Sequence, residues 1–348
     1  MKRALTLLWL LFLFSIPLWM RDLYVVHVLV ITGIFIIAAM SLNLLLGYAG
    51  QLSLGHVAFF GIGAYASSLM SLGFSVHVAP ETVIEMGPQP VWLAIPVAMV
   101  IAGLSGWFIG RLAFRVRGAY FVIVSICFAE VVRLVAVNWV ELTQGPMALN
   151  NIPPLTLWLP GLGEHTFWKK PENYWLVLTV AVVSYVVVRR LVQSRAGRAM
   201  IALRENEPLA TSIGVDVTRY LVVTTIASAA IAGSGGALYA HYIRIVDPDV
   251  FLFIYTVTMV IMVVTGGKGT LTGPIVGGLI FGLLPEILRA FEIAPEVQWI
   301  LYGVLMILVV YYLPEGIVPA VRKWWVQLGY GSGRGRSSGG TPATGTGQ

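Results

Sequence analysis

Charged residues are scarce in this sequence. Asp, Glu, Lys and Arg make up 11% of the 348 residues, while 58% are hydrophobic. Soluble globular proteins carry about 25% charged residues, and a soluble chain of this length would divide into two or three domains. A helix surrounded by lipid has no need of a polar face, so one membrane domain accounts for the whole length. The composition predicts an all-α, polytopic membrane bundle.

Several kinds of chemistry are excluded by what is missing. Cys127 is the single cysteine, which rules out an intrachain disulfide and any zinc site built on several cysteines. The histidines lack the spacing of a metal site. The segment GGKG at 266–269 lacks the first glycine of a phosphate-binding loop and the hydroxyl after its lysine. We therefore expect no metal, cofactor or ATP site in this chain.

Long apolar runs replace these motifs. Spanning the hydrocarbon core takes about 20 apolar residues. Ten candidate spans lie at roughly 4–20, 23–46, 52–72, 91–110, 119–140, 173–190, 220–242, 251–265, 274–290 and 297–313. The run at 4–20 is interpreted as a retained helix, with a cleaved signal peptide as the alternative. Residues 251–290 could form two spans or a re-entrant hairpin.

The basic residues predict an orientation. With the N-terminus inside and alternating spans, sixteen Lys and Arg residues fall inside and five outside. Cytoplasmic loops are enriched in Lys and Arg, so both termini are predicted to be cytoplasmic. The net charge of +6 is spread over short clusters between apolar runs, which argues for a lipid bilayer and against a nucleic acid as partner. The predicted membrane domain covers residues 1–325, and the Gly/Ser-rich tail at 326–348 is expected to be disordered.

The longest inside loop, residues 191–219, shows signs of local structure. Residues 198–204 are good helix formers, and Pro208 suits the first turn of a helix. Gly214 suits a C-terminal cap. A short amphipathic helix is predicted near 208–213, of a kind that docks into a groove on a soluble partner.

Several sequence blocks occur in one order over roughly residues 35–320. They are SLNLLLGYAGQLSLGHVAFFGIGAY at 41–65, RGAY at 117–120, FAEVVR at 128–133, LTQGP at 142–146, the loop at 195–214, ALYAHY at 237–242 and GGKGTLTGP at 266–274. Together they resemble the permeases of branched-chain amino acid ABC importers, the LivM type more than its LivH-type partner. The resemblance implies a bacterial inner-membrane importer that moves Leu, Ile or Val; a urea or amide permease of the same family is the alternative.

The resemblance also implies partners. These are a LivH-type permease subunit, two cytoplasmic ATPases that hold ATP and Mg²⁺, and an external substrate-binding protein. A cytoplasmic loop in such permeases often carries Glu-Ala-Ala, three residues and then Gly. The corresponding positions here match only at Ala210 and Gly214, and Glu207 lies one place early. The candidate contacts with the ATPase are Arg198, Arg204, Glu205, Glu207, Ala210 and Gly214.

Two groups of polar residues are candidates for the substrate pathway. Asn43, Gln51, Ser53 and His56 surround the junction between the second and third spans, where they face the pathway or cap and tie two helix ends. Glu130 and Arg133 share one face of the fifth span. They pair with each other or bind the ammonium and carboxylate groups of a zwitterion.

Two other classes of protein stay open. A self-sufficient secondary transporter or channel would move solute without an ATPase. An intramembrane enzyme would need a catalytic pair within the bilayer, and no Ser/His/Asp arrangement is visible in the sequence.

The first prediction concerns sidedness. Residues 191–219 are expected to be labelled only from the cytoplasmic side, because the six arginines between positions 189 and 219 mark an inside loop. Cysteines placed one at a time in this loop, and in the outside loop at 73–90 as a control, can be probed in intact cells with an impermeant maleimide. Labelling of 191–219 from outside would remove the basis for a cytoplasmic motor.

Overall fold

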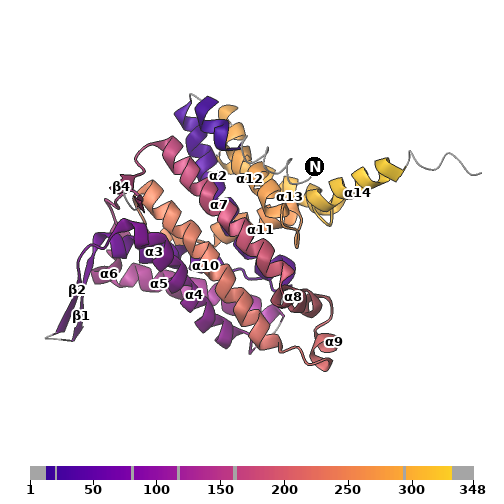
Figure 1. The fold of residues 1–348 in the computed structure, drawn as a ribbon, viewed down its shortest axis with the longest axis horizontal. Helices are drawn as coiled ribbons and strands as arrows, with labels where there is room; N and C mark the ends of the chain where they lie inside the picture. The colour runs from indigo at the N-terminus through magenta and orange to yellow at the C-terminus, as the bar shows by residue number, and fades with distance from the viewer. Residues whose placement is uncertain are drawn as a thin grey trace, which may run out of the picture.

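The structure is a computed structural model that describes residues 13–19, 22–79, 82–115, 118–159, 163–292 and 295–330. Helices run through nearly all of this range, in layers that share one long axis (Figure 1). The first half contains α2 (Leu23–Asn43), continued by a π-helical turn η1 (Leu44–Tyr48), then α3 (Val57–Leu72), η2 (Val91–Leu93), α4 (Ala94–Ala113), α5 (Ala119–Asn138), α6 (Val140–Thr143) and η3 (Gly145–Met147). The second half contains α7 (Lys170–Gln193), α8 (Arg195–Glu205), α9 (Glu207–Ser212), α10 (Val217–Ile243), η4 (Pro248–Phe251), α11 (Phe253–Gly266), α12 (Gly273–Ala290), α13 (Pro295–Tyr312) and α14 (Ile317–Tyr330).

Helix α10 is the centre of the bundle. Its N-cap, Asp216, accepts a hydrogen bond from the Arg219 amide at 3.0 Å, and the helix ends at Arg244, whose φ of 66° is left-handed. Between these ends α10 packs against α2, α3 and α4. Within its most apolar stretch 78% of the residues are buried, more than in the other long apolar helices that the structure describes.

Small residues make this close packing possible. On α4 they recur every fourth position and are all buried: Ala94, Ala98, Ala102, Gly106 and Gly110. A Cβ added at Gly233 of α10 would lie 2.5 Å from the Ala102 Cβ and 2.7 Å from the Ala98 carbonyl oxygen. Backbones this close gain dispersion and polar contacts where apolar burial alone gives little, as expected for helices in lipid.

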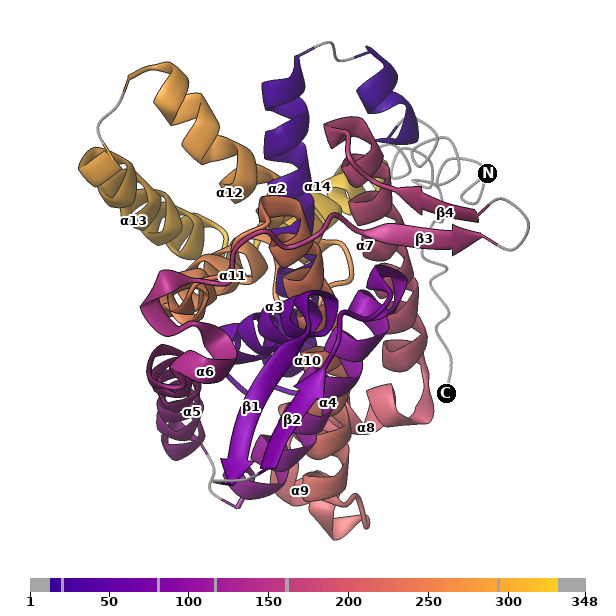
Figure 2. The same cartoon turned by 90° about the vertical axis from the view of Figure 1, so that its left-hand side faces the viewer.

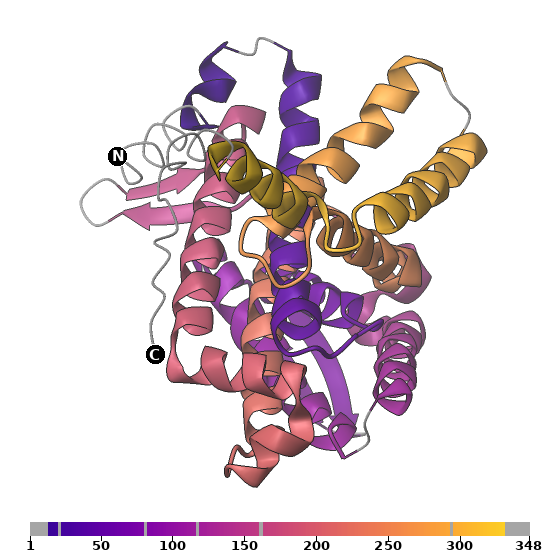
Figure 3. The same ribbon diagram turned by 90° about the vertical axis from the view of Figure 1, so that its right-hand side faces the viewer.

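Helices α11 and α12 occupy most of residues 251–290, the segment predicted to form two spans or a re-entrant hairpin. Helix α12 runs antiparallel along α2: the Glu286 carboxylate meets the Tyr24 hydroxyl at one end, and Gly278 and Gly282 pack on Ile36 and Thr32 further along. It also packs closely on α11, where a Cβ added at Gly277 would lie 1.8 Å from the Met262 carbonyl oxygen. Helix α11 has 14 residues, about 21 Å, and is shorter than a hydrocarbon core of about 30 Å. Figure 3 shows α12 and α13 (orange to yellow) splayed away from α7.

The connections gather at two opposite ends of the bundle. Residues 44–56, the α8–α9 segment and the 267–272 turn lie at one end, joined by hydrogen bonds from Asn43 and Arg204. Two β-hairpins lie at the other end, β1 (Phe74–Ala79) with β2 (Thr82–Met86) and β3 (Thr156–Leu159) with β4 (Gly163–Thr166) (Figure 2). A bridge between Leu149 and Val246 adds a further link there. Alternating spans require this division.

Some elements differ from the sequence prediction. The hairpins lie in segments expected to be loops, although the alternation in FSVHVA at 74–79 is a strand signal. The third predicted span, 52–72, becomes helical only at Val57. Five described helices meet the length and hydropathy of a membrane span, and α3 and α11 are shorter apolar helices. Residues 326–330 continue α14, and the rest of the predicted tail and most of the span at 4–20 lie outside the described residues.

The α10–α4 contact gives a stability prediction. Gly233→Val should lower the thermal midpoint of the detergent-solubilised protein by several degrees, since overpacking a tight contact costs about 1–3 kcal/mol. Gly303→Val on α13 is the matched control, because an added Cβ there meets no atom within 4 Å. Size-exclusion chromatography after heating measures both variants. Equal midpoints would contradict the close-packing account.

Candidate coupling site and pathway residues

The α8–α9 segment forms a basic platform at the end of the bundle opposite the hairpins (Figure 1). Helix α8 is capped by Ser194, whose hydroxyl accepts from the Gly197 amide, and α9 by Asn206, whose side chain accepts from the Leu209 amide at 3.0 Å. Asn206 also separates the two helices through its extended backbone. The predicted helix at 208–213 is thus confirmed as α9, and the helix-forming stretch at 198–204 lies in α8.

One side of the platform is anchored and the other is free. Ala210 is 2% exposed and packs in the apolar cluster under α4 and α10, while Leu209 and Ile213 are 62% and 74% exposed. Gly214 ends the segment with a φ of +88°, a conformation that favours glycine. Leu209 and Ile213 were not among the predicted contacts, although their spacing of four residues placed them on one helix face.

Arg204 faces the membrane bundle. Its Nη1 donates to the Gly47 carbonyl oxygen at 2.6 Å, and its Nη2 pairs with Glu205 at 2.5 Å. Gly50 packs against its aliphatic stem, where an added Cβ would lie 2.8 Å from Cγ. Arg204 therefore ties α8 to the end of α2, whereas Arg198 on the same helix is exposed and reaches only the Gln193 carbonyl at 3.3 Å.

Asn43 joins the same place from the membrane side. Its Oδ1 accepts from the Gly269 amide at 2.9 Å and its Nδ2 donates to the Thr270 carbonyl at 2.8 Å. The π-helical turn η1 follows directly, and such turns are frequent at functional sites. The ends of α2 and α8 and the α11–α12 turn thus form one hydrogen-bonded unit, called here the coupling junction: Asn43, Gly47, Arg204, Gly269 and Thr270.

His56 and Ser53 lie elsewhere. The His56 ring is fully buried and its Nε2 lies 2.7 Å from the Ser41 hydroxyl. Because Ser41 donates to the Ala38 carbonyl at 2.6 Å, we assign the proton of this contact to Nε2. The Ser228 hydroxyl of α10 donates to the Ser41 carbonyl at 2.5 Å, so this group ties α2 to α10.

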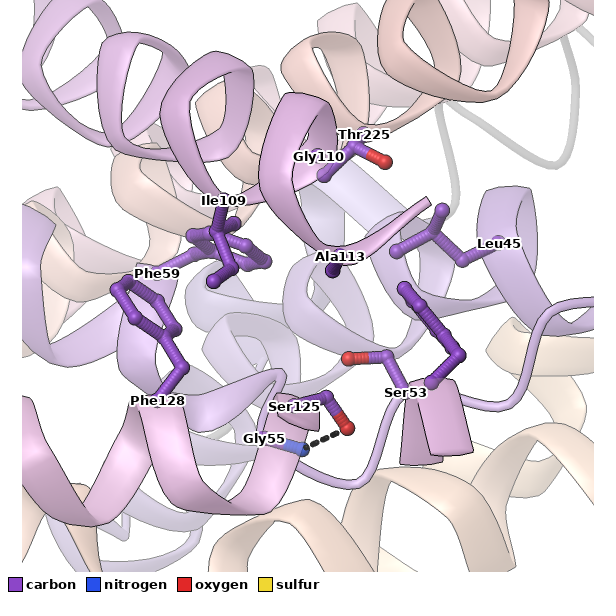
Figure 4. Close-up of a pocket in the computed structure, with 11 residues that line it drawn as sticks. Leu45, Ser53, Gly55, Phe59, Ile109, Gly110, Ala113, Ser125, Phe128 and Thr225 are labelled. Carbon is purple, nitrogen blue, oxygen red and sulfur yellow. Dashed lines mark hydrogen bonds between the residues drawn. The ribbon is translucent and has the colours of Figure 1, made fainter. Parts of the chain in front are cut away.

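Ser53 lines a small enclosed space between α3, α4 and α5 (Figure 4). Ser125 on α5 receives hydrogen bonds there from the Leu54 and Gly55 amides, at 3.1 and 3.3 Å. The space is about 10 Å³, enough for about one water molecule. The fourth residue of the predicted cluster, Gln51, is half-buried, and its backbone N–H donates to the Leu45 carbonyl oxygen at 2.8 Å. These contacts tie helix ends together, and the role of this group in the substrate pathway stays a prediction.

Glu130 and Arg133 do form a pair. The Arg133 Nη1 lies 3.0 Å from Glu130, and its Nη2 lies 3.8 Å from Asp249 of η4. The side chains of Glu130 and Asp249 are 55% and 64% exposed. Asp249 is far from Arg133 in the sequence, and only the fold brings η4 to α5.

Metal chemistry finds no support in the part of the chain described. Groups of three or more His, Cys, Asp or Glu residues able to hold a metal ion are absent among these residues. The fold is a helical bundle with several helices long and apolar enough to cross a membrane, and a short two-helix segment at one end is tied by hydrogen bonds to helix breaks inside it. These features define a multi-pass membrane protein.

The chain belongs to the family described as "Branched-chain amino acid transport system / permease component", whose model matches residues 24–310. It is thus a permease subunit of an ABC importer. It is 30% identical over 319 residues to the high-affinity branched-chain amino acid transport system permease protein LivM of Salmonella typhimurium, covering 85% of this chain and 70% of that protein.

Other relatives are more distant. A probable LivM permease of Methanocaldococcus jannaschii is 25% identical over 82% of this chain and 91% of its own length. The LivH permease of Escherichia coli K12 is 26% identical over 83% of this chain and 93% of its own length. No solved structure matches the chain.

The coupling junction gives a local prediction. Asn43→Leu keeps the side-chain volume but leaves the Gly269 amide and the Thr270 carbonyl unpaired, at about 1–3 kcal/mol for each buried group. Hydrogen–deuterium exchange should accelerate in residues 267–272. Asn138→Leu is the control, since the Asn138 amide bonds only within its own helix, to Leu134. Unchanged exchange in Asn43→Leu would show that Asn43 does not hold the turn.

Proposed function

We propose that this chain is the LivM-type half of an importer that carries branched-chain amino acids across the bacterial inner membrane. The named LivM and LivH relatives support the substrate class. Two cytoplasmic ATPases would supply the energy, with ATP and Mg²⁺ bound on them, and an external binding protein would deliver the substrate. The observation that carries the proposal is the α8–α9 platform. Arg204 bonds it to the π-helical turn at Gly47, and Asn43 bonds that place to the turn at Gly269 and Thr270.

The orientation follows from charge. The platform end of the bundle carries the arginines of the 189–219 stretch, together with Lys268, Arg322 and Lys323. Placing that end in the cytosol satisfies the preference of Lys and Arg for the cytoplasmic side. With this orientation and the ten predicted spans, both termini are cytoplasmic. The two hairpins then lie outside, within reach of a binding protein.

The platform has the features of a docking element for the motor. Leu209 and Ile213 form an exposed apolar patch among charged neighbours. Apolar side chains that become buried dominate the energetics of most protein interfaces, so this patch suits docking. Buried Ala210 and the caps at the starts of α8 and α9 fix the position of Leu209 and Ile213. Of the candidate contacts, Arg198, Glu205 and Gly214 are exposed beside this patch, and Glu207 stands at the start of α9.

Movement of the platform would reach the pathway through the coupling junction. A rigid shift of α8 pulls on the Gly47 carbonyl through Arg204, and Asn43 passes the shift to the α11–α12 turn. Both places are breaks in helices, a π-helical turn and a glycine-rich turn, where backbone dihedrals change with little loss of hydrogen bonding. Opening and closing of α2, α11 and α12 would then follow the state of the ATPases.

The Arg204–Gly47 hydrogen bond predicts that a substitution at Arg204 separates ATP hydrolysis from transport. In proteoliposomes holding the assembled importer, Arg204→Met should lower ATP-driven leucine uptake at least tenfold while ATP hydrolysis continues, because the motor still docks but its movement is not transmitted. Arg195→Met on the same helix should leave uptake near the unchanged level, since Arg195 is exposed and its replacement removes an equal charge without a contact to α2.

Arg204→Lys tests whether the planar shape of the guanidinium is required. Lysine keeps the charge but not the planar guanidinium that reaches the carbonyl, so partial activity is expected. Equal uptake by Arg204→Met and Arg195→Met would contradict the coupling role of the Arg204–Gly47 hydrogen bond. Uptake driven by an ion gradient with this chain alone in liposomes would contradict the importer proposal as a whole.

A further inference from the structure

Helix α5 stands at the edge of the bundle (Figure 2). In its most apolar stretch 22% of residues are buried, against 67% in α2 and 78% in α10. Burial is lower still in α7, at 17%, but the exposed side chains there include Val183, Val186 and Val187, which are apolar. A large apolar pocket, about 840 Å³, separates the outer half of α5 from α3 and α4. The helix therefore receives little support from its own chain.

The outward face of α5 carries a charge. Its exposed residues recur at helical spacing: Tyr120, Ile123, Cys127, Glu130, Val131 and Leu134. Glu130 stands in the middle of this stripe, with Asp249 beside it across Arg133. Two carboxylates around one guanidinium leave a net charge of −1, and the buried Nε of Arg133 has no hydrogen-bond partner.

Contact with lipid would be unfavourable for this face of α5. Glu130 lies eight residues before the end of α5, about 12 Å along the helix, and a charged group deep in hydrocarbon costs about 2.5–3.5 kcal/mol. Other exposed helix faces differ. Those of α4 and α13 present Val100, Leu104, Phe108, Val304 and Ile307, all apolar. The α5 face is suited to a protein surface that offers hydrogen-bond donors.

The relatives indicate which protein. LivM and LivH permeases both match this chain over more than four-fifths of its length, so a second permease subunit would share its fold. Two chains of one fold pair most simply about a two-fold axis, which brings equivalent faces together. Two copies of this chain would place two clusters of net charge −1 against each other. Like charges held in contact disfavour that pairing and favour a different partner chain.

We propose that the α5 face, Ile123 to Leu134 with Asp249, is the docking surface for the second permease subunit, which opposes Glu130 and Asp249 with a basic or amide side chain. The inference rests on the proposed function. It adds that the unbalanced carboxylate selects a heterodimer over a homodimer.

Photo-crosslinking tests the surface in the assembled importer. p-Benzoylphenylalanine is placed at position 127, within the stripe, or at position 187 on the apolar face of α7, where Val187 is 46% exposed. Position 127 should yield a covalent product with the second permease subunit at least tenfold above position 187. A product only with lipid, with the external binding protein or with a second copy of this chain would overturn the proposal.

Charge reversal tests the selection. Glu130→Lys should lower recovery of the second permease subunit with the tagged chain at least tenfold. Leu104→Lys on α4, where Leu104 is 61% exposed, is the control for a misplaced charge. Normal recovery with Glu130→Lys would overturn the proposal. The two failures are distinguishable: absence of any ATPase or permease partner from the unaltered complex contradicts the proposed function, whereas an active complex without the 127 product contradicts only the surface.

Discussion

The close approach of α10 to α4 is the contact on which the rest of the bundle depends. In lipid, apolar side chains gain little by leaving one apolar solvent for another, so helices hold together through tight backbone contact and a few polar ties. Gly233 against Ala98 and Ala102 provides that contact at the centre. Once α10 is fixed there, α2 and α3 pack on its other sides, and both ends of α10 carry the functional segments of the molecule.

Polar groups are used where helices break. A broken helix in a membrane leaves amides and carbonyls that lipid cannot satisfy. At the coupling junction they are satisfied by Asn43 and Arg204, and at the start of α3 by Ser125 and Thr256. The same bonds that make a break tolerable also connect distant segments. Under the proposed function, a motor that moved α8 would therefore also move these helix ends.

Specific residues show how far sequence reasoning reached into the site. The α9 helix and the Gly214 cap were predictable because capping and proline preferences act over a few residues. The pair Glu130–Arg133 was predictable from a spacing of three along one helix. Asn43 was found as a candidate but its partners, Gly269 and Thr270, lie 226 and 227 positions away. Arg204 was assigned to the motor, and the fold turns it toward Gly47, a carbonyl with no side chain to mark it.

Hydrophobicity and short helix signals are properties of local sequence, so the sequence alone determined a multi-pass helical bundle and the short helix α9. The late start of α3 and the partners of Asn43 depended on which segments lie side by side. Those neighbours were decided only in the tertiary structure, because hydrogen bonds such as those of Asn43 to Gly269 and Thr270 join residues more than 200 positions apart.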